Sequence, residues 1–220
     1  MLRLRGLSIW GLNVGLTGGV LFAGAGRLDL PMFWAFLAVV SSILLLLVFT
    51  IDPDLARERI RPAPGGRDRI LRLVAPLLMV IHLAVAGLDV GRLHISDGVP
   101  LRLQVAALMG VAAGLGLAVW AASVNRFFSP VIRIQEERGH QVVTTGPYHY
   151  VRHPGYAGNV LAASCSALAL GSMWSMVPAV IVALLILRRM RIEDRFLHDN
   201  LGGYGDYAAT VRHRAVPGLW

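Results

Sequence analysis

The sequence predicts an all-α, polytopic integral membrane protein, and three observations support this fold class. Of its 220 residues, 55% are hydrophobic and only 15% are charged. Long apolar runs recur through most of the chain, and arginines gather in the segments between them. Soluble domains carry about 25% charged residues. This composition therefore leaves too little polar surface for an ordinary soluble protein.

Six apolar runs are expected to form membrane helices, because about 20 mainly apolar residues cross the hydrocarbon core as a helix. Four runs have that length, near residues 7–26, 32–51, 71–91 and 101–124. Two shorter runs follow near 156–171 and 174–190, joined only by the turn Gly171, Ser172, Met173. We expect these two to form a helical hairpin that tilts or does not fully span. The working count is six crossings, with five as the alternative.

The arginines predict the orientation. The basic start at Arg3 and Arg5 also resembles a signal peptide, but no clear cleavage site precedes a soluble domain, so we expect a retained first span. If the N-terminus is cytoplasmic, 18 of the 21 arginines lie inside and only Arg27, Arg92 and Arg102 lie outside. Cytoplasmic segments of membrane proteins are enriched in arginine and lysine. We therefore expect both termini in the cytoplasm, and the arginine-only, alanine-rich composition favours a bacterial inner membrane.

Composition also excludes some functions. The net charge of +8 comes from arginines between apolar runs, and no basic face with interleaved aromatic residues is present, so we expect no nucleic-acid binding. The single cysteine, Cys165, lies among small residues in an apolar run and is expected to pack there. No disulfide framework or cysteine cluster for a metal is possible. We expect no metal site.

Two ionisable residues fall within the third run, His82 and Asp89, nearly two helical turns apart. An ionisable residue inside the membrane is a functional hypothesis by default. For His82 we favour a core histidine with satisfied hydrogen bonds over a substrate or proton role. Asp89 lies near the outer edge and is expected to be solvated. The sequence leaves the roles of both residues open.

The stretch GPYHYVRHPGYAGN, residues 146–159, interrupts the apolar pattern. It holds two prolines, three tyrosines, two histidines, an arginine and three glycines. Pro147 and Pro154 forbid a regular helix through it and bias the residues before them toward extended backbone. Backbone amides left unpaired make it a candidate ligand cradle, although Arg152 as a topological anchor and Pro154 in a first helical turn would be the simpler account.

The chain is accordingly divided at the end of the fourth run. Residues 1–124 form an N-terminal four-span membrane bundle, and residues 125–220 form the region that carries the chemistry. Within the second part, residues 184–201 are predicted to be a helix that leaves the membrane. Glu193 near its exit has two equally weighted interpretations: a solvated pair with Arg189, which would contribute about 0.3–0.5 kcal/mol, or a carboxylate facing a cationic ligand.

Several motifs occur in order over residues 125–220. GPYHYVRHPGYAGN is followed by the apolar hairpin, the acidic pair Glu193-Asp194 and GGYGDYAATVRHRAVPG. Together they resemble the isoprenylcysteine carboxyl methyltransferase family and its relatives among membrane phospholipid methyltransferases. The first four spans resemble that family only as generic membrane helices. The resemblance implies a helical membrane enzyme that binds S-adenosylmethionine from the cytosol and admits a lipidic or amphiphilic methyl acceptor from the bilayer.

The resemblance also implies site residues. The cofactor loop would comprise Gly146, Pro147, Tyr148, Val151, Arg152, His153, Pro154, Tyr156 and Gly158. Glu193 would bind the amino group of the cofactor, and Asp194 stands where a second glutamate is more usual. Tyr204, Tyr207 and Arg214 would belong to a tail that closes over the cofactor. Gly202-Gly203 replaces a frequent Phe-Gly, so an aromatic contact is missing there.

Direct displacement of a methyl group from a sulfonium needs orientation more than proton transfer. An ionised acceptor needs no general base, which agrees with the lack of a Ser/His/Asp or metal-ligand constellation. An arginine fork is a natural clamp for a carboxylate, and Arg152 or Arg214 would supply it. Asn125, directly after the fourth span, would either cap the helix end or hydrogen-bond a ligand. The identity of the acceptor, and whether oxygen, nitrogen or sulfur is methylated, stays open.

Two alternatives of other classes remain. The RHPGY sequence also resembles the C-terminal part of membrane sterol reductases, which bind NADPH. Such a reductase would need more cytoplasmic contacts and ten spans rather than six, and no GxGxxG fingerprint is present here. The other alternative is a non-catalytic, lipid-binding relative.

Overall fold

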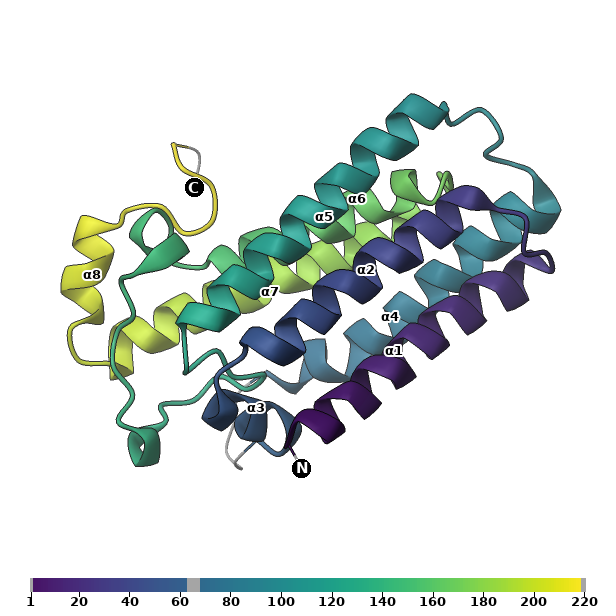
Figure 1. The fold of residues 1–220 in the computed structure, drawn as a ribbon. Coiled ribbons are helices and arrows are strands. Elements are labelled where there is room, and N and C mark those ends of the chain that lie inside the picture. Colours follow the sequence, from purple (N-terminus) through teal and green to yellow (C-terminus); the bar gives the residue numbers. More distant parts are fainter. Residues whose placement is uncertain (1, 63–67, 219–220) are drawn as a thin grey trace.

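The computed structural model describes residues 2–62 and 68–218, and every regular element in those residues is helical. Six long helices run alongside one another, and α3, α8 and the connection 125–153 lie at one end of the bundle (Figure 1). The long helices are α1 (Leu2–Ala25), α2 (Pro31–Thr50), α4 (Arg69–Leu88), α5 (Leu101–Val124), α6 (Pro154–Ala169) and α7 (Met176–Asn200). The short elements are α3 (Pro53–Ile60), η1 (Asp89–Leu93), η2 (Glu136–Arg138), η3 (Gly146–His149) and α8 (Tyr204–Thr210).

Among the described residues, four helices are long and apolar enough to cross a membrane. They are Leu2–Ala25, Pro31–Thr50, Ile70–Leu93 and Leu101–Val124, close to the first four predicted spans. The predicted all-α, polytopic membrane fold is thereby confirmed. Helix α6 has 16 residues, fewer than the roughly 20 that a crossing needs. The total of six crossings, the orientation and the division after residue 124 stay predictions; Arg67, counted in the charge asymmetry, lies outside the described residues.

Prolines and one aspartate mark where helices begin. Pro31, Pro53 and Pro154 occupy the first position of α2, α3 and α6, where the missing N–H costs no hydrogen bond. Asp52 caps α3, since its Oδ1 accepts hydrogen bonds from the backbone N–H groups of Asp54 at 2.8 Å and Leu55 at 3.1 Å. The cap at Asp52 therefore stabilises the first turn of α3, directly after the end of α2.

The predicted helical hairpin is present, because α6 ends at Ala169 and α7 begins at Met176 and continues unbroken to Asn200. Helix α6 packs closely against α5. A Cβ added at Gly158 would lie 2.3 Å from the carbonyl oxygen of Gly114, so glycine permits a backbone contact that no other residue would allow. This contact positions the first turns of α6, which lead into the motif-rich loop.

At the opposite end of the hairpin, Asp89 is buried and only 2% exposed. Its carboxylate accepts hydrogen bonds from Ser96 N–H at 3.1 Å, Ser96 Oγ at 2.6 Å and Ser172 Oγ at 2.5 Å. The expectation that Asp89 is solvated is wrong, because the hairpin turn covers it and supplies a hydroxyl. His82 is also buried, with Nδ1 2.9 Å from the Ser175 carbonyl oxygen, while its Nε2 has no partner among the described residues. Both side chains connect α4 to the turn between α6 and α7.

Candidate functional site

A cleft lies where the connection after α5, the start of α6, the last turns of α7 and α8 meet. The cavity within it measures about 70 Å³. Ligand pockets usually measure about 300–1,000 Å³. Binding of a nucleotide-sized ligand therefore requires the lining of this cleft to move apart.

Many of the predicted site residues line this cleft. They are Asn125, Tyr148, Arg152, His153, Tyr156, Glu193, Tyr204 and Tyr207. Arg152 and Glu193 therefore converge on one cavity, as the sequence-based hypothesis required. The remaining candidates lie outside the lining: Gly146, Pro147, Val151, Pro154, Gly158, Asp194 and Arg214. The functional roles assigned to all of these residues stay predictions.

Glu193 is held by a tyrosine and forms no direct ion pair with Arg189. The hydroxyl of Tyr156 donates to Glu193 Oε2 at 2.6 Å and accepts from Arg189 Nε at 2.9 Å. Arg189 also donates to the carbonyl oxygen of Pro130 at 2.7 Å. The solvated Glu193–Arg189 pair is therefore replaced by a chain in which Tyr156 lies between the two charges. This chain fixes the Glu193 carboxylate at the cleft.

Asp194, the next residue, has a different environment. Its Oδ1 accepts from Arg152 Nε at 2.9 Å and from the Tyr204 hydroxyl at 2.9 Å, and lies 3.0 Å from His153 Nε2. Its Oδ2 accepts from Arg214 Nε at 2.7 Å. Burial alone would raise the pKa of this carboxyl, but the hydrogen bonds from His153, Arg152 and Arg214 outweigh burial and hold the pKa well below its usual range. Asp194 is thus an ionised junction between α7, the loop, α8 and the tail.

The tail after α8 is bound to the loop by main-chain contacts as well. Arg152 N–H donates to the His213 carbonyl oxygen at 2.9 Å, and His153 N–H donates to that of Arg214 at 2.8 Å. The Arg152 guanidinium also donates to the carbonyl oxygens of Val211 at 2.7 Å and Arg212 at 2.9 Å. Arg152 is engaged through Nε, Nη1 and Nη2 and cannot clamp an acceptor without giving up these partners, whereas Arg214 contacts Asp194 through Nε alone.

The tyrosines of the tail close one wall of the cleft. Tyr207 donates its hydroxyl to the Tyr148 carbonyl oxygen at 2.7 Å, and the Tyr204 and Tyr207 ring centroids are 5.7 Å apart. Burial raises the pKa of Tyr207 to about 12 and raises the pKa values of Tyr148 and Tyr204 further. These phenols stay protonated at neutral pH and serve as hydrogen-bond donors rather than bases.

The sequence did not identify the opposite wall, which the loop 127–143 supplies. Gln135 is buried and donates Nε2 to the Phe127 carbonyl oxygen at 2.8 Å. His140 Nδ1 accepts from the Gln135 N–H at 3.3 Å, and the His140 ring lies 4.5 Å from the Phe127 ring. This segment has neither helical nor strand periodicity, so no sequence pattern could have indicated which of its side chains turn inward.

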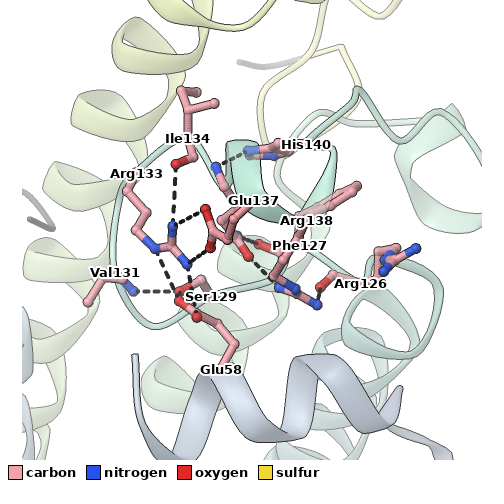
Figure 2. A network of polar contacts seen from close by, with 11 residues as sticks. Glu58, Arg126, Phe127, Ser129, Val131, Arg133, Ile134, Glu137, Arg138 and His140 are labelled. Atoms are coloured by element: carbon pink, nitrogen blue, oxygen red, sulfur yellow. Dashed lines mark hydrogen bonds and ion pairs between the residues drawn. The ribbon is translucent and has the colours of Figure 1, made fainter. Parts of the chain in front are cut away.

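Helix α3 holds this loop in place (Figure 2). Glu58 is buried at 7% exposure and accepts hydrogen bonds from Arg133 Nη2 at 3.0 Å and Ser129 Oγ at 2.9 Å. Arg133 pairs also with Glu137 at 2.6 Å. Glu58, which lies in the N-terminal half of the chain, therefore fixes one wall of the cleft. All the residues that line the cleft come after α5 in the sequence. The 75 residues between Glu58 and Arg133 conceal this pair from sequence analysis.

The sequence model of the isoprenylcysteine carboxyl methyltransferase (ICMT) family matches residues 106–199. A probable protein-S-isoprenylcysteine O-methyltransferase of Oryza sativa subsp. indica is 34% identical over 97 residues, covering 43% of this chain and 50% of that protein. Protein-S-isoprenylcysteine O-methyltransferase B of Arabidopsis thaliana is 31% identical over 91 residues, covering 40% of this chain and 46% of that protein. The cobalt-zinc-cadmium resistance protein CzcN of Cupriavidus metallidurans is 34% identical over 97 residues, covering 42% and 43%.

The chain thus spans about half the length, or slightly less, of the curated relatives that it matches. The matched segment contains most of α5, the loop 125–153, α6 and nearly all of α7. It therefore includes the Arg152–Asp194 junction and the Tyr156–Glu193 pair described above. Residues 106–199 of this chain are thus similar to the isoprenylcysteine carboxyl methyltransferase family.

Proposed function

We propose that this protein is an integral membrane methyltransferase that moves a methyl group from S-adenosylmethionine to a lipidic or amphiphilic acceptor by direct displacement. The observation that carries the proposal is the position of Glu193. Its carboxylate lines the cleft and accepts a hydrogen bond from the Tyr156 hydroxyl at 2.6 Å. The match of residues 106–199 to the ICMT family model supports the same reaction class.

The residues of the cleft fit the charged groups of S-adenosylmethionine, which are an ammonium, a carboxylate and a sulfonium. Glu193 is a suitable partner for the ammonium, since its negative charge faces the cleft without a directly paired arginine from its own helix turn. The first turn of α6, at Gly155 and Tyr156, presents backbone N–H groups beside the same cleft. A helix N-terminus favours an anionic group such as a carboxylate.

When bound, S-adenosylmethionine supplies an electrophilic methyl group on a positively charged sulfur. The contribution of the chain is orientation. Tyr156 fixes Glu193 from one side and is itself held by Arg189. Burial keeps Tyr148 and Tyr204 protonated, and the Tyr204 hydroxyl donates to Asp194. Attack by an anion on a cation reduces charge in the transition state, so weakly solvating surroundings favour it.

The roles of Asp194, Arg152 and Arg214 follow from their shared junction. We assign Asp194 to positioning, because it holds the loop and tail that border the cleft rather than lining the cleft itself. Opening of the cleft for the cofactor then occurs around this junction. Since S-adenosylmethionine is a cytosolic metabolite, the proposal also assigns this end of the bundle, and both termini, to the cytoplasmic side of a bacterial inner membrane.

Cofactor binding and methyl transfer test the proposal directly. The full-length protein, purified in detergent, is expected to bind S-adenosylmethionine in calorimetry and to transfer a labelled methyl group to a component of a membrane lipid extract. Glu193→Gln should weaken binding by about tenfold or more, since a charge-assisted hydrogen bond contributes about 1.5–3 kcal/mol. Glu136→Gln, an exposed change in η2, is the matched control.

The possible outcomes distinguish a failure of the proposed function from a failure of the role assigned to Glu193. A parent protein that neither binds S-adenosylmethionine nor transfers a methyl group would overturn the proposed function. A parent that binds the cofactor, together with a Glu193→Gln variant of equal affinity, would leave the function intact and show that the ammonium is bound elsewhere.

A further inference from the structure

A second cavity lies between α1, α2 and α3. This cavity is open on one side and has a volume of about 600 Å³, compared with about 70 Å³ for the cleft. Its lining is mostly apolar, with Trp10, Leu47 and Phe49 among the contributors, and its charged residues are Arg3, Asp52 and Arg59. Its lining comes mainly from the start of α1, the end of α2 and α3, which lie at the end of the bundle where the connection 125–153 is found (Figure 1). An apolar chain of lipid size fits such a space.

Arg59 lies between this cavity and the cleft. It lines the cavity, donates Nη1 to the carbonyl oxygen of Phe128 at 3.2 Å, and its guanidinium lies 5.5 Å from the Phe128 ring. Phe128 lines the cleft, where its ring packs over the first turn of α6 so closely that a Cβ added at Gly155 would lie 2.5 Å away. One aromatic ring and one guanidinium therefore separate the apolar cavity from the proposed cofactor site.

The charge of Arg59 has no carboxylate partner within 4.0 Å among the described residues. The acidic residues of its own helix and cap are engaged elsewhere. Glu58 pairs with Arg133, while Asp52 accepts from the first N–H groups of α3. Asp54 forms a surface pair with a neighbouring arginine of the same helix. Arg59 thus lines a mostly apolar cavity without a carboxylate to neutralise its charge.

Two further charged or polar groups act on Arg59. Its side chain is accessible because it opens onto the cavity, yet the surrounding protein lowers its pKa by burial, Tyr156 raises that pKa and Arg189 lowers it. Arg59 is therefore within electrostatic range of the Tyr156–Glu193 chain that holds the proposed cofactor site. The second guanidinium, that of Arg189, adds to the positive potential at this point, which attracts an anion.

We infer that Arg59 binds the carboxylate head of the methyl acceptor, while the apolar tail of the acceptor lies in the cavity between α1, α2 and α3. This inference rests on the proposed function and specifies its substrate as a single-tailed amphiphile with an anionic head. Arginine is suited to the task because its planar fork matches a carboxylate. The assignment also leaves Arg152 in its contacts with Asp194 and the tail.

The same contact accounts for product release. One carboxylate oxygen forms a C–O bond with the methyl carbon while the C–S bond of the sulfonium breaks, and the electron pair of that bond stays on sulfur. The products are a neutral ester and a neutral thioether, with no proton transferred. Because the ester has lost the charge that Arg59 binds, it is held less tightly than the acid.

Trp10 allows this binding to be measured without any assay of activity. It lines the cavity and donates its indole N–H to the Ser41 carbonyl oxygen at 2.9 Å. Bromine atoms quench tryptophan on contact, so dibrominated stearic acid and its methyl ester are used as probes with the same tail and different heads. The difference between the parent and Trp10→Phe isolates quenching in the cavity. We expect the acid to reach half-quenching at a lower concentration than the ester.

Arg59→Gln should raise the half-quenching concentration of the acid about tenfold, the effect of losing one charged hydrogen bond, and leave that of the ester unchanged. Arg57→Gln, an exposed change on the same helix, should change neither value. Equal quenching by acid and ester in the parent would overturn the inference and indicate a groove for any lipid tail. An unchanged acid value in Arg59→Gln would overturn it as well.

Calorimetry with S-adenosylmethionine on the same preparations distinguishes the two proposals. If the parent binds the cofactor but shows no preference for the acid, only the role of Arg59 fails. If the parent prefers the acid but binds no cofactor, the methyltransferase proposal fails, and Arg59 remains a binding residue for an amphiphilic anion. Retained cofactor binding by Arg59→Gln shows that the variant is folded.

Discussion

Arg152 Nε donates a hydrogen bond to Asp194 Oδ1 over 2.9 Å, and this pair joins the loop before α6 to the last turns of α7. The side chains of His153, Tyr204 and Arg214 contact the same carboxylate. Four segments of the region 146–214 therefore depend on one buried negative charge. Removing that charge would leave the buried Arg152 guanidinium without a counter-charge.

Asp194→Ala is accordingly expected to lower the free energy of unfolding by about 3–5 kcal/mol, the usual cost of removing one partner of a buried ion pair. Reversible unfolding in detergent would measure this difference. Asp199→Ala, an exposed change on the same helix, should alter the free energy by no more than about 0.5 kcal/mol. Similar stability of the two variants would mean that the junction does not hold the loop and tail together.

Tyr156→Phe tests the positioning of Glu193 with little change of shape. The substitution removes the hydroxyl that donates to Glu193 at 2.6 Å and accepts from Arg189 at 2.9 Å. We expect the affinity for S-adenosylmethionine, measured by calorimetry, to fall about tenfold, since the net effect of such a hydrogen bond is about 1.5 kcal/mol. Tyr150→Phe is the matched control, because Tyr150 lies in the loop just before α6 and is 64% exposed. Equal affinities of the two variants would contradict the positioning role.

The sequence predicted the parts of the site that local chemistry determines. Prolines 147 and 154 and the loss of apolar periodicity located the loop, and charge after a long apolar run located the exit of α7. The acidic pair could not be resolved in the same way. Adjacent residues on a helix point in different directions, so Glu193 lines the cleft whereas Asp194 enters the junction. Only the packing of α7 decides which carboxylate lines the cleft and which one contacts Arg152.

Contacts between distant segments explain the remaining differences. Glu58 and Arg133 are 75 residues apart, and Asp89 receives a hydroxyl from Ser172, 83 residues further along the chain. No periodicity connects such pairs, because each depends on how two helices approach one another. Arg59 is the same case: the sequence counted it only as a positive charge in a cytoplasmic loop, and the fold brings it beside Phe128.

The close contact of α5 and α6 gives a prediction about packing. A Cβ at position 158 would lie 2.3 Å from the Gly114 carbonyl oxygen and 2.9 Å from the Ala118 nitrogen. Gly158→Ala is therefore expected to lower the free energy of unfolding by about 1–3 kcal/mol and to weaken cofactor binding, since Tyr156 lies in the same turn of α6. Unfolding in detergent and calorimetry would measure the two effects.

Gly116→Ala on α5 is the control for this change. No atom lies within 4 Å of a Cβ added there, and alanine favours a helix over glycine by about 1 kcal/mol. The variant should be as stable as the parent or slightly more stable. If Gly158→Ala behaves like Gly116→Ala, α5 and α6 are free to separate and do not fix the start of the site.

His140 gives the wall of the cleft a dependence on pH. Burial, together with the nearby charges of Arg133 and Arg138, lowers the pKa of His140 from 6.5 to about 4. Between these two values the unfolded chain carries a proton on His140 that the folded chain does not. Because stability rises with pH wherever the unfolded state binds more protons, the contribution of neutral His140 is complete above about pH 6.5 and is lost progressively as the pH falls to about 4.

His140→Asn should therefore make the melting temperature less dependent on pH over this interval. The asparagine side-chain oxygen can accept the Gln135 N–H in place of Nδ1, so the loop keeps its hydrogen bond while losing its titrating group. Melting curves of the parent and the variant at several pH values measure the effect, and the carboxylates common to both proteins cancel in the comparison. Parallel curves would contradict a neutral, buried His140, whereas curves that converge as the pH rises would support it.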